Sequence, residues 1–204
     1  MNSEIKVIVF DFGGVLIGWD PRNLYSRFFP EQPQAMEDFL AEVSFMEWNA
    51  QQDKGRPFTQ GIAILSQQFP HYSQLIQAYY DHWIDSVKEP IAGAVSILKR
   101  LKQRGYSLYG LSNWSTETYP HARQRFDFFG MFDGVVLSGA VGHVKPEPEI
   151  YQIMLAKTGR PAQECLLIDD SLANIHQAQK MGFAVIHFQS AGQLENDLHG
   201  LELL

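Results

Sequence analysis

The chain lacks the features that mark several classes of protein. It contains a single cysteine, Cys165, so no disulfide can form within the chain. Its 16 lysines and arginines are outnumbered by 23 aspartates and glutamates. No basic stripe is present to neutralise nucleic-acid phosphates, and we expect no nucleic-acid partner. No apolar run is long enough to cross a bilayer, and Asp11 interrupts the amino-terminal one. We therefore expect a cytoplasmic protein with no membrane partner.

What the chain does have is the composition of a globular protein, with 45% hydrophobic residues. A length of 204 residues suits one domain with a sizeable insertion, or two small domains. We expect a monomer or a homodimer.

Short apolar runs alternate with helical patterns along most of the chain. Such alternation predicts an α/β fold in which right-handed crossovers build a five-stranded, mainly parallel sheet. The five runs that predict strands are 5–10, 107–111, 134–137, 165–168 and 183–187.

The stretch between the first two predicted strands differs from the rest. It shows no convincing strand, and its helical patterns are rich in aromatic residues, most of which we expect to be core packing. We predict a separate helical domain over 18–89, inserted into an α/β core domain formed by 1–17 and 90–204.

Polar residues follow four of the five predicted strands. In a parallel sheet, ligands bind beyond the carboxyl ends of the strands, so these side chains should gather at one edge. They are Asp11, Ser112, Asn113, Lys145, Asp169 and Asp170.

The residue types at this edge favour phosphoryl chemistry. Three carboxylates repel one another, and a divalent cation with hard oxygen ligands, Mg²⁺, resolves that repulsion. Asp11 would be the nucleophile, Lys145 would neutralise negative charge, and Ser112 would hold phosphoryl oxygens at a helix amino terminus. Taken singly, each residue also has a plain structural explanation as a helix cap, an acidic helix start or a solvated loop lysine. Their joint occurrence at successive strand ends favours the site.

This constellation resembles the haloacid dehalogenase superfamily of aspartate-nucleophile hydrolases. The resemblance implies a Rossmann-like core, a helical cap over 18–89, Mg²⁺ held by Asp11, Asp169 and Asp170, and substrate contacts from Ser112, Asn113 and Lys145. Segments 112–114, 145–151 and 168–174 also resemble bacterial sugar-phosphate phosphatases of the glucose-1-phosphate type. The four superfamily motifs correspond to Asp11-Phe12-Gly13-Gly14-Val15, Leu111-Ser112-Asn113, Lys145-Pro146 and Asp169-Asp170.

Gly13 departs from the pattern of typical phosphatases of this superfamily, which carry an acid–base Asp at that position. Its carbonyl can still bind Mg²⁺, but the lost proton transfer is typically worth about 10²–10⁴-fold in rate. Either a cap residue or an ordered water replaces it, or the leaving group needs no acid, or turnover is poor. The candidates for a substitute are Glu47, Asp53 and His143.

The leading hypothesis is a Mg²⁺-dependent phosphatase acting on a small phosphorylated metabolite, such as a sugar phosphate. The alternatives are a weakly active or non-catalytic protein that binds phosphorylated ligands, and a 2-haloacid dehalogenase. The Asp169–Asp170 pair argues against the dehalogenase, because that branch generally lacks it. Trp48 and Arg56 are further candidates for substrate contact, and Trp114 for either the pocket or the core.

Overall fold

A five-stranded parallel sheet forms the centre of the computed structural model, which describes residues 4–204. The strand order is β5-β4-β1-β6-β7. The prediction of an α/β fold with a parallel sheet is confirmed, and the predicted strand bounds agree with the observed ones to within two residues. The strands are β1 (Val7–Phe10), β4 (Ser107–Ser112), β5 (Gly134–Leu137), β6 (Cys165–Asp169) and β7 (Ala184–His187).

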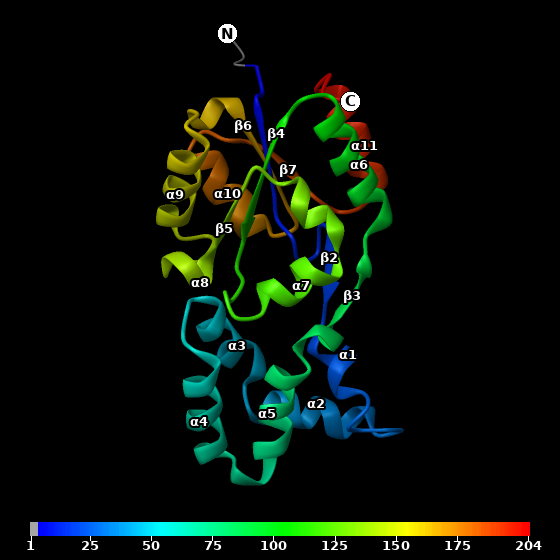
Figure 1. Ribbon diagram of the computed structural model, residues 1–204, viewed down its shortest axis with the longest axis vertical. Helices are drawn as coiled ribbons and strands as arrows, with labels where there is room; N and C mark the ends of the chain where they lie inside the picture. The colour runs from blue at the N-terminus through cyan, green and yellow to red at the C-terminus, as the bar shows by residue number, and fades with distance from the viewer. Residues whose placement is uncertain (1–3) are drawn as a thin grey trace.

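Helices cover both faces of the sheet (Figure 1). Alternate residues of β1 point to opposite faces, so Ile8 and Phe10 join one hydrophobic core while Val7 and Val9 join the other. The first core is closed by α6 (Ala92–Gln103) and α11 (Ala191–Gly200), and the second by α9 (Pro148–Thr158) and α10 (Leu172–Lys180). Burial on both faces explains why β1, and β6 up to Ile168, are apolar.

A helical segment, residues 21–86, leaves and rejoins the sheet through a short antiparallel ribbon. The ribbon pairs β2 (Ile17–Trp19) with β3 (Val87–Pro90). These strands were not predicted, because they are too short to show an alternating pattern. Each lies at one end of the stretch expected to hold helices alone, and the division into two domains stays a prediction.

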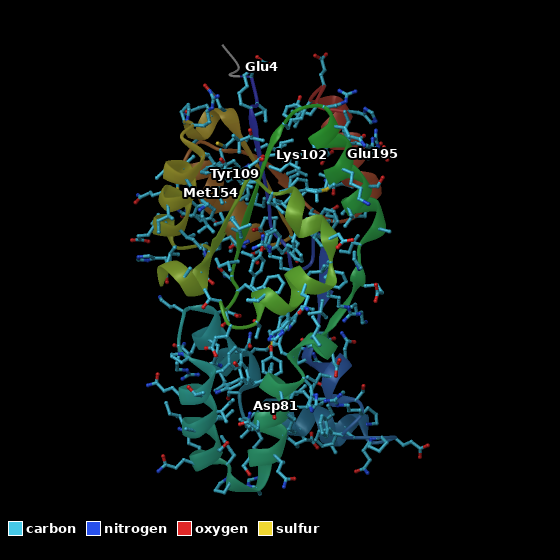
Figure 2. The ribbon with its side chains drawn as sticks, in the orientation of Figure 1. Glu4, Asp81, Lys102, Tyr109, Met154 and Glu195 are labelled. Atoms are coloured by element: carbon cyan, nitrogen blue, oxygen red, sulfur yellow. The ribbon has the colours of Figure 1, made fainter. Side chains whose placement is uncertain are left out.

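Aromatic rings form the core of the helical segment, as expected. Tyr25 makes edge-on contacts with Phe39 and Phe45, at centroid distances of 5.0 and 5.8 Å. Asp81 marks this segment in Figure 2, below the sheet region that carries Tyr109 and Met154. Its helices are α1 (Pro21–Tyr25), α2 (Pro33–Glu42), α3 (Phe45–Asp53), α4 (Phe58–Gln68) and α5 (Ser73–Asp81).

The carboxyl ends of the parallel strands face this helical segment (Figure 1). Between them lie two short helices of the sheet region, α7 (Tyr119–Arg125) and α8 (Ser138–Val141). Short 3-10 helices cover Pro70–Tyr72, Trp83–Ser86, Asp127–Met131 and Ala162–Glu164. Among residues 4–204, no helix is both long enough and apolar enough to span a membrane.

Candidate active site

A buried lysine joins two buried carboxylates at the edge predicted from the sequence. Lys145 Nζ lies 2.9 Å from Asp11 Oδ2 and 2.6 Å from Asp169 Oδ2. Phe10 of β1 is paired with Ile168 of β6, so the next residue on each strand places a carboxylate at the same level. Their side chains are 11% and 0% exposed, and that of Lys145 is 1% exposed. Because all three charges are buried, each depends on the others for compensation.

Asn113 holds the backbone of Lys145 in place. Its Nδ2 donates to the Lys145 carbonyl at 3.0 Å, and its Oδ1 accepts from the Lys145 backbone N–H at 2.7 Å. Both ends of the amide are therefore engaged by one residue. Sequence reasoning assigned Asn113 to substrate. The structure adds its contacts with the lysine backbone, and its contact with substrate stays a prediction.

Asp169 is fixed by two further donors. Its Oδ1 accepts from the backbone N–H of Ser171 and from Nδ2 of Asn174, both at 2.9 Å. Sequence reasoning did not assign Asn174 a role, although it stands one helical turn beyond the acidic pair. An asparagine one helical turn after Asp170 was the sequence feature that could have indicated this hydrogen bond.

Burial sets the protonation of this cluster. The pKa of Asp11 is raised to about 7, first by burial and further by the negative charge of Asp169, against the lowering effect of Lys145. Burial alone would lower the pKa of Lys145, but the two neighbouring carboxylates raise it above its usual value. The lysine is therefore charged. A divalent cation beside Asp11 would lower its pKa and favour the carboxylate form.

The donor set at this edge fits a magnesium ion. Asp11, Asp169 and Asp170 each offer one oxygen, and these oxygens lie within 4.8 Å of one another. The backbone at Gly14 approaches Asp170 so closely that a Cβ there would lie 2.1 Å from its Oδ2, and φ is +74°. Only glycine suits that position. This contact brings the turn that contains Gly13 beside the carboxylates, which is the arrangement expected if the Gly13 carbonyl joins them.

A cavity of about 170 Å³ lies at the same edge of the sheet, lined by residues close in sequence to Asp11 rather than by Asp11 itself. Gly13, Ser112 and Asn113 border it from the sheet region, while Asp53 and other side chains of the helical segment border it from the opposite side. Ser112 is 3% exposed and is the predicted phosphate contact that reaches this space. The structure thus brings together the residues predicted for metal and substrate.

The aromatic and basic residues singled out in the helical segment lie elsewhere. Trp48 donates from Nε1 to the Gly61 carbonyl at 3.0 Å inside the core of the segment. Arg56 donates to Gln52 Oε1 at 2.6 Å and does not line the cavity. Trp114 serves both predicted roles, because it borders the cavity and packs against Phe12.

The three acid–base candidates are separated by the fold. Glu47 is exposed and lines a different depression, on the surface of the helical segment. His143 lies 3.3 Å from Glu147 in a partly exposed pair. Asp53 alone among them borders the cavity.

Comparison with known proteins places the chain in a family. A model described as haloacid dehalogenase-like hydrolase matches residues 5–182. The sesquiterpene phosphatase astK of Aspergillus oryzae is 26% identical over 188 residues, covering 92% of this chain and 91% of that protein. A D-ribitol-5-phosphate phosphatase of Bacteroides thetaiotaomicron is 25% identical over 207 residues, covering 95% and 97%.

A solved structure shares the fold. The haloacid dehalogenase family enzyme bt-2542 of Bacteroides thetaiotaomicron superposes with a TM-score of 0.75 at 22% identity, covering 92% of this chain and 95% of that one. That enzyme has also been solved in complex with magnesium and inorganic phosphate. Because the family model spans most of its length and the fold agrees, the chain belongs to the haloacid dehalogenase-like hydrolases and is a hydrolase.

Proposed function

We propose that the protein is a Mg²⁺-dependent phosphatase that hydrolyses a small phosphomonoester through an aspartyl-phosphate on Asp11. The observation that carries this proposal is the buried contact of Lys145 with Asp11 and Asp169, beside a cavity lined by Ser112. The two phosphatases similar over nearly the whole chain support it.

Each residue of the cluster has a task in the reaction. One oxygen of Asp11 attacks phosphorus while the bond from phosphorus to the ester oxygen breaks, leaving a phosphorylated Asp11 and a free alcohol. Lys145 offsets the repulsion between the anionic nucleophile and the anionic phosphate, and Ser112 donates a hydrogen bond to a phosphoryl oxygen. Mg²⁺, held by Asp11, Asp169, Asp170 and the Gly13 carbonyl, would supply charge neutralisation. Water then cleaves the phosphoryl group from Asp11.

Two polar groups in the cavity favour a hydroxylated substrate. Trp19 Nε1 and Tyr79 Oη are buried and make no hydrogen bond within residues 4–204, and both residues border the cavity. An unsatisfied buried donor costs about 1–3 kcal/mol, which a hydroxyl group of a bound polyol or sugar phosphate would relieve. The name of the D-ribitol-5-phosphate phosphatase agrees with such a substrate.

An apolar alcohol is the second candidate for the leaving group. The indole rings of Trp83 and Trp114, 5.4 Å apart, form much of the remaining wall. The relative named as a sesquiterpene phosphatase agrees with a substrate of this kind. A cavity of about 170 Å³ limits either substrate to a small molecule.

Hydrolysis of p-nitrophenyl phosphate tests the proposal. We expect activity that requires Mg²⁺ and is abolished in Asp11→Asn, whereas the surface control Asp81→Asn keeps it. Full activity in Asp11→Asn would contradict covalent catalysis by Asp11. No activity in the wild-type protein would favour the non-catalytic phosphate-binding alternative, and halide release from 2-haloacids would favour the dehalogenase. Ribitol 5-phosphate and an isoprenoid monophosphate, assayed side by side, then separate the two substrate classes.

A further inference from the structure

Asp53 borders the cavity from the helical segment. It is the last residue of α3 and borders the same space as Gly13 and Ser112. Its Oδ2 accepts from Asn49 Nδ2 at 2.8 Å. Within residues 4–204, no lysine, arginine or histidine lies within ion-pair distance of this carboxyl group. Unlike Asp11, Asp53 therefore has no cation committed to it.

Contacts between the helical segment and the sheet region fix the position of Asp53. The Ser138 hydroxyl, after β5, donates to the Asp53 carbonyl. The next residue, Lys54, lies 2.6 Å from Glu147. At Gly55, φ is +112° and a Cβ would lie 3.0 Å from the carbonyl oxygen of Gly139. The turn after α3 is therefore seated on the loops that carry the active-site lysine.

The surroundings of Asp53 favour its neutral form near pH 7. Burial raises the pKa of Asp53 to about 7, and a backbone N–H of Ser115 acts in the opposite direction. The groups near its carboxyl group are Asn49 of its own helix, the backbone N–H of Ser115 and Tyr79 of α5, whereas Ser138 contacts its backbone carbonyl. Tyr79 is uncharged, because burial, and secondarily the charge of Asp53, raise its pKa well above the usual value. A carboxyl group with a pKa near the working pH can both give and take a proton.

We propose that Asp53 is the general acid and base that Gly13 does not supply, so that catalysis needs residues from both the sheet region and the helical segment. The inference rests on the proposed phosphatase function. Its geometric basis is that Asp53 is the carboxyl group of the helical segment that borders the cavity with Gly13. A Cβ at Gly13 would meet no atom within 4 Å, so a side chain can begin at this position without a clash.

The protons balance over the two steps. When Asp11 attacks phosphorus and the bond to the ester oxygen breaks, the carboxyl group of Asp53 gives its proton to the leaving oxygen, which departs as a neutral alcohol. Water then gives a proton to the Asp53 carboxylate as its oxygen attacks phosphorus. The bond between phosphorus and Asp11 breaks, which releases phosphate and restores both aspartates.

The dependence of kcat/KM on the leaving group tests whether Asp53 acts as the general acid. An alkyl phosphate needs its leaving oxygen protonated far more than p-nitrophenyl phosphate does. The ratio of kcat/KM for ribitol 5-phosphate to kcat/KM for p-nitrophenyl phosphate should therefore fall about 10²-fold or more in Asp53→Asn. The matched control Glu47→Gln, an exposed carboxylate of the same helix, should leave the ratio unchanged. An unchanged ratio in Asp53→Asn, including an equal loss on both substrates, would overturn the proposal.

Two further readouts separate catalysis from a structural effect. Asp53→Asn with p-nitrophenyl phosphate should give a burst of nitrophenol stoichiometric with enzyme, because hydrolysis of the aspartyl-phosphate lacks its base. Adding Gly13→Asp to Asp53→Asn should restore much of the lost ratio, since a Cβ at position 13 meets no neighbouring atom. A double variant that folds, hydrolyses p-nitrophenyl phosphate and gains nothing on ribitol 5-phosphate would count against the proposal. Asp11→Asn, assayed in parallel, reports separately on the proposed phosphatase mechanism.

Discussion

Buried polar groups on the two sides of the cavity differ in whether they have partners within the protein. On the sheet side, Asp11, Lys145 and Asp169 compensate one another at 2.6–2.9 Å. On the helical side, Asp53 has no cation partner, and Tyr79 has no hydrogen-bond partner within residues 4–204. Paired groups hold one another in position, which suits a nucleophile and its counter-ion. Unpaired groups remain available to a substrate hydroxyl or to a proton.

The largest loss of stability is expected from removing the lysine that pairs with the buried carboxylates on the sheet side. Lys145→Met leaves two buried carboxylates without their cation, which should lower the free energy of unfolding by about 3–5 kcal/mol. The matched control is Lys102→Met, whose partner Asp133 lies 2.6 Å away at the surface. Loss of that exposed pair should lower the free energy of unfolding by only about 0–1 kcal/mol. Urea unfolding of both variants measures the contrast, and equal losses would contradict it.

A smaller change in the free energy of unfolding is expected when the buried, unpaired Asp53 is replaced and the pH is varied. The pKa of Asp53 is about 7 in the folded protein and ordinary when unfolded, so the folded state binds more protons between about pH 4 and 7. Its burial therefore costs more stability as pH rises through that window. Relative to wild type, Asp53→Asn should gain about 2 kcal/mol between pH 5 and 8. Urea unfolding at the two pH values checks this, and a difference between the proteins that does not change with pH would contradict it.

The smallest effect compares two buried tyrosines. The hydroxyl of Tyr25 donates to the Leu75 carbonyl at 3.1 Å, whereas that of Tyr79 makes no hydrogen bond within residues 4–204. Tyr25→Phe should lower the free energy of unfolding by about 1 kcal/mol, and Tyr79→Phe should leave it unchanged or raise it. Because the free hydroxyl is assigned to substrate, Tyr79→Phe should instead raise KM for ribitol 5-phosphate about tenfold. An equal loss of stability in both variants would show that the Tyr79 hydroxyl is satisfied within the protein.

The sheet side of the site was predictable from the sequence because its geometry is local. An apolar run such as 165–168 predicts a buried strand, and parallel strands place the residues at their carboxyl ends along one edge of the sheet. Asp11 and Asp169 lie together because the structure pairs β1 with β6, a strand order that the sequence did not predict. The contact of Asn113 with the Lys145 backbone was missed, because an amide at a strand end looks the same in sequence whether or not it also binds the backbone of a distant lysine.

The helical side could not be predicted because it depends on contacts distant in the sequence. Asp53 reaches the cavity because the turn after α3 docks on Ser138, 85 residues away. Neither helical periodicity nor composition distinguishes Asp53 from the exposed Glu47 in the same helix. The ribbon of β2 and β3 was missed because its strands are too short to show a pattern, and because its pairing joins segments separated by the whole helical segment.

The most direct test of the central claim is to look for phosphate on Asp11. Wild-type protein mixed with Mg²⁺ and p-nitrophenyl phosphate, quenched in acid within a turnover and digested, should yield a phosphorylated peptide whose modified residue is Asp11. Asp53→Asn should accumulate more of this species, and Asp11→Asn should form none. Turnover without any phosphorylated peptide in either protein, or a phosphoryl group on another residue, would contradict the account.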